Sequence, residues 1–276
     1  MNPEPSRKRA QLPTYLYGAS VRLPRFFKRA KRLFLFLDFD GTLVEIASTP
    51  SQAIPRPETL ACLETLAKTP GISVAIVSGR PVENLQNLIG SRRLFYVGTH
   101  GVVILTPRGK RRVDPLGRKV IAAIASLKAG LSPSLKKTPG IFLENKDFSF
   151  ALHFRLAKRE LARRAVEEFN RAVNVCQEEG FPLEILRGKE MVEAKPAGVH
   201  KGKAVTTLLD RYGKGALPIY IGDDVTDEDA FQSLGARGIS ILVAENPRPT
   251  AASFYLRNPA QVREFLKALI DLKSGQ

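Results

Sequence analysis

Three short polar segments of the sequence combine residue types that bind metal ions and anions. Segment 38–42 is Asp-Phe-Asp-Gly-Thr, segment 78–80 is Ser-Gly-Arg, and segment 222–224 is Gly-Asp-Asp. Each segment follows directly on a run of mostly apolar residues. Carboxylates offer hard oxygen ligands to divalent cations, and the backbone N–H groups of a Gly-Thr turn can hold anionic oxygens. The sequence therefore indicates a site where a cation and an anionic group meet, provided that the three segments converge.

Convergence is expected if the apolar runs before these segments are neighbouring strands of one parallel sheet. In an open α/β sheet, ligands bind beyond the carboxyl ends of the strands. Carboxylates gathered there repel one another unless a cation neutralises them. Mg²⁺ is the simplest hard divalent ion for this purpose, and Mn²⁺ is the alternative. A calcium loop of the EF-hand type is the competing interpretation of segment 38–42, but the segment lacks that ligand spacing.

The apolar runs have the length and composition of strands that are buried on both faces. Between them, apolar residues recur at helical spacing. Strands that alternate with helices predict an α/β fold with a mainly parallel sheet. The expected strands are 33–37, 72–77, 217–221 and 239–243, and the expected helices are 57–68, 82–89, 201–212, 227–234 and 259–272.

The stretch from about 113 to 198 has a different order of elements. It reads as a helix, two strands, a helix and two strands, with Pro and Gly at both joins. We interpret it as a smaller α/β module inserted into the larger sheet. The predicted regions are a basic, poorly ordered arm over 1–32, a core over 33–112 and 199–276, and the inserted module over 113–198. Within the module we expect helices at 118–131 and 158–175, and strands at 140–145, 148–155, 183–186 and 190–194.

The expected strand 148–155 alternates between an apolar face and a more polar face. Its apolar side chains, which include Phe150 and Leu152, should pack on the helices of the module. The other face suits the hydroxyl groups of a sugar, which need both donors and acceptors, although a plain solvated sheet face is the alternative. The candidate polar residues of the module are Glu144, Lys146, His153, Lys189 and Glu193.

The net charge of +16 is concentrated towards the N-terminus. Residues 1–32 hold nine Lys and Arg side chains against Glu4 alone. Such a charge can attract nucleic acid or a small anionic substrate. The third interpretation is a basic arm that is simply solvated. The sequence has no RNP, zinc-finger or helix-turn-helix signature, so we do not expect nucleic acid as a partner. We expect a small-molecule substrate, no membrane partner, and a monomer.

The two cysteines and the hydropathy of the chain bear on its location. Cys62 and Cys176 are far apart and fall in helix-like stretches, which predicts reduced thiols in or near the core. A structural zinc site is not expected, because the cysteines and histidines do not cluster in sequence. The sequence contains no apolar run of 18 residues and no apolar leader segment, so we expect a cytoplasmic protein.

Taken together, the polar segments make the sequence similar to the haloacid dehalogenase superfamily of phosphotransferases. The matching motifs are 38–43, Ser78, a lysine at the start of helix 201–212, and 222–224. The resemblance implies a Rossmann-like core with an inserted cap. It also implies that Asp38 attacks phosphorus and forms an aspartyl phosphate, while Asp40 protonates the leaving oxygen and later deprotonates water.

The same resemblance assigns the remaining residues of the core. It implies that Asp38, the Asp40 carbonyl and Asp223 bind Mg²⁺, and that Ser78 hydrogen-bonds the phosphoryl group. Gly41 and Thr42 are candidates for binding the same anion through their turn. Lys201 is expected to neutralise the charge around the phosphate, with Lys203 as its rival, and we prefer Lys201 because it matches the Lys-Gly step of the superfamily.

Longer motifs resemble the trehalose-6-phosphate phosphatase family within that superfamily, over about residues 33–270. The resemblance implies hydrolysis of trehalose 6-phosphate. It also implies that Glu144, Lys146 and Glu193 bind the sugar from the cap. Arg80 and His153 are weaker candidates for further contacts with the substrate. Ala194 departs from the larger apolar residue that we expected there. A phosphatase for a sucrose or mannosyl phosphate is the alternative, and a catalytically silent sugar-phosphate sensor is a less favoured one. The motifs are 98–101, 144–146, 153–155, 188–196, 201–203 and 222–231.

Overall fold

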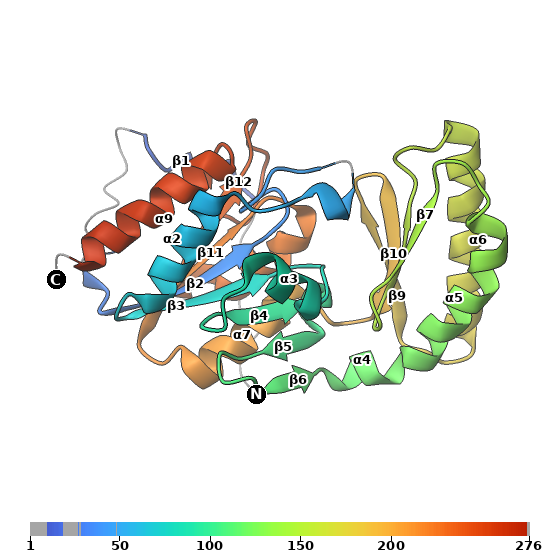
Figure 1. The fold of residues 1–276 in the computed structure, drawn as a ribbon, viewed down its shortest axis with the longest axis horizontal. Helices are drawn as coiled ribbons and strands as arrows, with labels where there is room; N and C mark the ends of the chain where they lie inside the picture. The colour runs from blue at the N-terminus through green and yellow to red at the C-terminus, as the bar shows by residue number, and fades with distance from the viewer. Residues whose placement is uncertain (1–9, 19–26, 28, 48, 275–276) are drawn as a thin grey trace. The chain divides into compact units, whose positions relative to one another are not determined.

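The fold is seen in a computed structural model that describes residues 10–18, 27, 29–47 and 49–274 (Figure 1). The chain divides into two compact units, each of which has its own sheet. The first unit comprises Met1–Arg111 and His200–Gln276, and the second unit comprises Arg112–Val199.

Within the described residues, the larger sheet has nine strands in the order β1-β13-β12-β11-β2-β3-β4-β5-β6. Neighbouring strands from β1 to β4 are parallel, and β5 is antiparallel to β4. The prediction of an α/β fold with a mainly parallel sheet is therefore confirmed. The strands are β1 Thr14–Tyr15, β2 Arg32–Asp38, β3 Ile72–Val77, β4 Phe95–Gly98, β5 Val103–Leu105, β6 Arg111–Val113, β11 Ala216–Gly222, β12 Ile239–Val243 and β13 Phe254–Leu256.

Strand β2 lies in the interior of this sheet and is buried on both faces. Phe34 and Phe36 pack in a cluster with residues of the helices α7 and α8, while Leu35 and Leu37 alternate with them and are also fully buried. Burial on both faces explains the unbroken apolar run. Helix α2 packs against α9, as Figure 1 also shows. The helices are α2 Pro57–Lys68, α3 Val82–Ile89, α7 Lys201–Tyr212, α8 Glu228–Leu234 and α9 Pro259–Ser274, with 3₁₀ turns at η1 Pro50–Gln52, η2 Thr99–Gly101, η3 Val225–Asp227 and η4 Gly235–Arg237.

The prediction of a poorly ordered arm over 1–32 is wrong for residues 10–18. Strand β1 pairs in parallel with β13, with Thr14 opposite Phe254. Leu16 is buried, and Gln11 forms a bridge to Thr250. The strand was not predicted because two residues carry no periodic signal, and the edge of β13 supplies the pairing. Of the rest of the arm, residues 1–9, 19–26 and 28 lie outside the described residues, whereas Phe27 is buried and Arg32 begins β2.

The second unit contains a four-stranded antiparallel sheet in the order β7-β8-β10-β9. Phe150 and Leu152 of β8 pack in one cluster with residues of helices α5 and α6, as the alternation of that strand predicted. The elements are α4 Pro115–Lys119, α5 Ile121–Leu135, β7 Phe142–Asn145, β8 Phe150–His153, α6 Arg159–Glu178, β9 Leu183–Gly188 and β10 Met191–Pro196.

Some predicted boundaries of the second unit are wrong. The expected helix 118–131 is two helices, α4 and α5, which meet at Val120. Strand β8 is shorter than 148–155, because Asp147 takes the left-handed conformation at φ 63° and residues 146–149 form a turn. Apolar periodicity does not report such local breaks.

Cys62 and Cys176 are buried and form no disulfide bond within the described residues, which confirms that both thiols lie in or near the core. Among the residues that the structure describes, every helix is too short or too polar to span a bilayer.

Candidate active site

The end of strand β2 places Asp38 at the sheet edge where β3 and β11 also end. Asp38 is the last residue of β2 and lies opposite Val77, the last residue of β3. On the other side of β2, Leu37 lies opposite Ile221, so the chain reaches Asp223 just beyond the end of β11. The three polar segments found in the sequence therefore leave the sheet at the same edge.

Lys201, the first residue of α7, lies between two carboxylates. Its Nζ is 2.7 Å from Oδ1 of Asp38 and 2.8 Å from Oδ1 of Asp227, and all three side chains are almost fully buried. Burial lowers the pKa of Lys201, but the Asp227 and Asp38 carboxylates outweigh burial and hold this pKa above its usual value. The ammonium therefore stays charged and offsets the repulsion between the carboxylates.

Burial raises the pKa of Asp38 well above its usual value. Lys201 acts in the opposite direction, while the negative charges of Asp227 and Asp223 raise the pKa of Asp38 further. Because a carboxylate nucleophile must be ionised, additional positive charge beside Asp38 would favour its reactive form.

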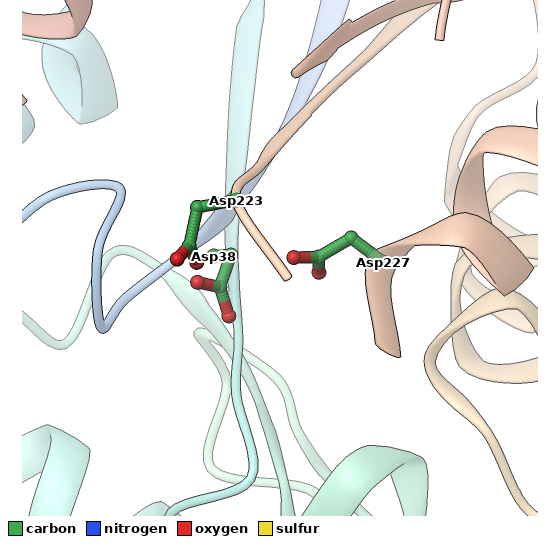
Figure 2. A group of neighbouring side chains, drawn as sticks. All are labelled: Asp38, Asp223 and Asp227. Atoms are coloured by element: carbon green, nitrogen blue, oxygen red, sulfur yellow. The ribbon is translucent and has the colours of Figure 1, made fainter. Parts of the chain in front are cut away.

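Asp38, Asp223 and Asp227 form a group that fits a divalent cation (Figure 2). One carboxylate oxygen from each residue lies within 4.8 Å of the others. The donors are hard anionic oxygens, which Mg²⁺ prefers. Gly41, at φ 83°, comes so close to Asp223 that a Cβ atom at position 41 would overlap the carboxylate. The glycine therefore allows the turn after Asp38 to approach the acidic group.

Asp40 forms a two-point ion pair with Arg80. Nε of Arg80 donates to Oδ2 of Asp40 at 2.8 Å, and Nη2 donates to Oδ1 at 2.6 Å. Nη1 of the same guanidinium donates to Asn84 at 3.1 Å, and the guanidinium lies over the ring of Phe39. The Arg80 side chain is buried, whereas that of Asp40 is 41% exposed. This two-point contact fixes the orientation of the Asp40 carboxylate.

Two buried hydroxyl groups complete the core group of predicted residues. Ser78 is 2% exposed, and its Oγ accepts a hydrogen bond from the backbone N–H of Arg80 at 3.2 Å. Thr42 is fully buried, and its Oγ1 has no hydrogen-bond partner among the described residues. An unsatisfied buried hydroxyl beside the Gly41 turn suits a ligand oxygen.

The turn η2 supports the loop that carries Ser78 and Arg80. The backbone N–H of Thr99 donates to the Arg80 carbonyl at 2.9 Å, and the N–H of His100 donates to the Ser78 carbonyl at 3.1 Å. Thr99 and His100 are both left-handed, at φ 49° and φ 55°. Such strain persists only where the surroundings hold the chain in place, and it is concentrated at functional sites.

Asp227 is a residue that sequence reasoning missed. It stood in the expected helix 227–234 and in the motif 222–231 without a role of its own, yet its Oδ1 accepts hydrogen bonds from both Lys201 and the Tyr220 hydroxyl at 2.7–2.8 Å. Its Oδ2 accepts the backbone N–H of Asp224 at 2.9 Å. The acidic run 223–229 was a signal for this role, but the choice of Asp227 depends on long-range contacts to α7 and β11.

A second group of predicted residues lies on one face of the four-stranded sheet. Glu144 and Glu193 both lie opposite Ala151 of β8, so they share a face. Nε2 of His153 is 2.9 Å from Oε2 of Glu144, and Nζ of Lys146 is 2.9 Å from Oε2 of Glu193 and 3.7 Å from Oε2 of Glu144. The strands therefore join four of the candidates into one polar network.

The charge state of Glu144 reflects these contacts. Burial raises the pKa of Glu144, but the hydrogen bond with His153 and the charge of Lys146 outweigh burial and lower the pKa overall. Lys189 differs from the other candidates, because it is exposed in the turn between β9 and β10. The hydrogen bonds and ion pairs that join the polar network within the described residues do not include Lys189.

Comparison with known proteins places this geometry in context. The family model described as trehalose-phosphatase matches residues 36–260. A trehalose-phosphate phosphatase of Mycobacterium marinum is 36% identical over 240 residues, which cover 84% of this chain and 60% of that protein. The probable trehalose-phosphate phosphatase 4 of Oryza sativa subsp. japonica is 34% identical over 254 residues, which cover 89% of this chain and 68% of that protein. The chain thus spans 60% of the length of the mycobacterial relative.

Solved structures show the same fold. The C-terminal domain of a trehalose-6-phosphate phosphatase from C. albicans superposes with a TM-score of 0.81 at 24% identity, covering 96% of this chain and 99% of that chain. A trehalose-6-phosphate phosphatase from Aspergillus fumigatus gives a TM-score of 0.63 at 27% identity, covering 95% and 99%. The resemblance found in the motifs is thereby confirmed, and the chain belongs to the trehalose-phosphatase family.

Proposed function

We propose that the protein hydrolyses trehalose 6-phosphate to trehalose and phosphate, with Mg²⁺ as its cofactor and an aspartyl phosphate on Asp38 as the intermediate. The observation that carries the proposal is the group of buried Asp38, Lys201 and Asp227 with half-buried Asp223 at the end of the central strands. Phosphoryl transfer depends chiefly on positioning and on charge stabilisation, and this group can provide both.

In the first half of the reaction, a carboxylate oxygen of Asp38 attacks phosphorus while the bond from phosphorus to the sugar oxygen breaks. Asp40 gives its proton to that leaving oxygen, which releases trehalose. The two hydrogen bonds from the Arg80 guanidinium hold the Asp40 carboxylate in one orientation. We assign Ser78, with Gly41 and Thr42, to the phosphoryl oxygens, because Ser78 follows Val77, which lies opposite Asp38, and because the Gly41 turn approaches Asp223.

In the second half, Asp40 takes a proton from water as the water oxygen attacks the aspartyl phosphate. The bond between phosphorus and Asp38 breaks, which returns the carboxylate and releases phosphate. Lys201 keeps positive charge beside Asp38 throughout. Bound to Asp38, Asp223 and the Asp40 carbonyl, Mg²⁺ would add positive charge next to the phosphoryl group. Asp227 is already engaged by Lys201 and Tyr220, so we assign it to orienting Lys201.

We assign recognition of the sugar to the second unit, residues Arg112–Val199, as a cap. Glu144, Lys146 and His153 combine acceptors and donors on one sheet face, which suits sugar hydroxyl groups. Glu193 orders Lys146 in this network, and we assign Lys189, in the turn between β9 and β10, as a further contact to the sugar. Two free buried thiols agree with a reducing, cytoplasmic location, and the net charge of +16 disfavours self-association.

The test of substrate class is phosphate release from a panel of sugar phosphates. Trehalose 6-phosphate should give a kcat/KM at least about tenfold above those of sucrose 6-phosphate, a mannosyl phosphate and glucose 6-phosphate. A flat profile across the panel would contradict the trehalose 6-phosphate assignment and favour a broader sugar phosphatase. Lack of turnover on every compound would favour a sugar-phosphate sensor.

A further inference from the structure

Ser149 lies immediately before strand β8 and is fully buried. Its Oγ donates a hydrogen bond to Oε1 of Glu193 at 2.6 Å. The backbone carbonyl of Ser149 accepts the N–H of Lys146 at 2.9 Å, which closes the turn around the left-handed Asp147. Ser149 therefore contacts both partners of the ion pair between Lys146 and Glu193.

The ion pair itself depends on geometry. Lys146 Nζ donates to Oε2 of Glu193, the oxygen that Ser149 does not occupy, and both side chains are at most 8% exposed. A buried ion pair is favourable only when its geometry is good and its remaining acceptor sites are satisfied. The Ser149 hydroxyl meets this requirement, because it donates a hydrogen bond to one oxygen of the Glu193 carboxylate. This bond fixes the rotation of the carboxylate relative to Lys146.

The ion pair between Lys146 and Glu193 is also connected to the more exposed part of the polar network. Lys146 is 3.7 Å from Glu144, and Glu144 pairs with His153 at 2.9 Å. The side chains of Glu144 and His153 are each more than 20% exposed, so they can meet a ligand. Ser149 is thus the buried end of a chain of contacts whose other end is accessible.

We infer that Ser149 is a positioning residue for sugar recognition: it fixes Glu193, and through Glu193 it fixes Lys146 and Glu144. The inference rests on the proposed function, and it assigns Ser149 to affinity for the sugar rather than to the phosphoryl-transfer step. Ser149 belongs to the second unit, whereas Asp38, Asp40 and Lys201 belong to the first unit. Loss of its hydroxyl should weaken binding of ground state and transition state equally, which raises KM and leaves kcat nearly unchanged.

The experiment compares Ser149→Ala with Ser240→Ala, using trehalose 6-phosphate and p-nitrophenyl phosphate as substrates. Ser240 is a matched control, because it is fully buried in the first unit and its Oγ has no hydrogen-bond partner among the described residues. Ser149→Ala should raise KM for trehalose 6-phosphate about tenfold, with kcat and the p-nitrophenyl phosphate rate within about twofold of wild type. Ser240→Ala should leave all three quantities within the same limits.

A double-mutant cycle with Glu193→Gln tests whether Ser149 acts through Glu193. If it does, the double variant should raise KM by clearly less than the product of the two single effects. Ser149→Cys, which has a similar shape and a weaker donor, serves as the second variant if the alanine variant does not fold.

Three outcomes would count against the account, and they are distinguishable. An unchanged KM in the variant that folds would overturn the inference on Ser149. Equal losses of kcat/KM on both substrates, with a lower melting temperature, would reduce Ser149 to a structural role. A wild-type protein that releases no phosphate from trehalose 6-phosphate would instead contradict the proposed function, on which the inference rests.

Discussion

Asp38 and Lys201 are 163 positions apart in the sequence, yet the carboxylate and the ammonium lie 2.7 Å from each other. Strand β2 delivers the first residue and the start of helix α7 delivers the second. The second unit is inserted between them along the chain. The site therefore exists only when the two segments of the first unit have come together.

Asp38→Asn should abolish phosphate release and leave the fold intact. The amide is nearly the same size as the carboxylate but is not a nucleophile, so kcat should fall by at least about 10³-fold. Thermal unfolding and far-UV circular dichroism would verify that the variant is folded. A variant that keeps more than about a tenth of the wild-type kcat would contradict the assignment of Asp38 as nucleophile.

Lys201→Met should destabilise the protein, because it leaves the carboxylates of Asp38 and Asp227 buried together without their shared ammonium. Removal of one partner from a buried ion pair costs about 3–5 kcal/mol of unfolding free energy. Urea denaturation would measure the change. Lys203→Met is the matched control, since Lys203 is exposed on the same helix and its loss should cost less than about 1 kcal/mol. Equal losses in the two variants would contradict the account.

Arg80→Lys should lower kcat on trehalose 6-phosphate about tenfold, because lysine cannot reproduce the two-point contact that directs Asp40. Arg93→Lys provides the matched control, since Arg93 is exposed and lies 3.7 Å from Glu64. Steady-state kinetics on both variants would separate kcat from KM. If Arg80→Lys retained full kcat, the positioning of Asp40 by Arg80 would not matter for turnover.

Glu144 should make stability depend on pH in the acid range. Its pKa in the folded protein is lowered from the usual 4.5, so the unfolded chain takes up a proton there more readily than the folded chain. The stabilisation from this group is therefore present above about pH 4.5 and is lost as the pH falls through the lower, folded value.

Urea denaturation of the wild type and of Glu144→Gln across pH 3 to 7 would measure this dependence. The stability difference between the two proteins should shrink on acidification. A difference that stays constant or grows as the pH falls would show that the pKa of Glu144 is not lowered by its contacts with His153 and Lys146.

Much of the core fold could be predicted because burial dictates it directly. The run 33–37 is apolar at every position since β2 is covered on both faces, and β3 and β12 have the predicted bounds. Helices α2, α3 and α7 also begin and end where the spacing of apolar residues predicts. In these segments the local pattern and the tertiary environment agree.

Short strands and partner choice could not be predicted in the same way. Strands β1, β5 and β13 have two or three residues each, too few for a periodic pattern, and they form because a neighbouring edge pairs with them. Asp227 joins the site through Lys201 and Tyr220, which belong to other elements. Ser149 is likewise identified only by its contact with Glu193, since a lone serine in a turn carries no signal.

The most direct test of the central claim is phosphate release from trehalose 6-phosphate by the purified protein, before and after removal of metal with EDTA. The account predicts turnover with Mg²⁺ present, a loss of at least about 100-fold with EDTA, and recovery when Mg²⁺ is added in excess. Turnover that is indifferent to EDTA, or no turnover under any of these conditions, would contradict a metal-assisted phosphatase built around Asp38.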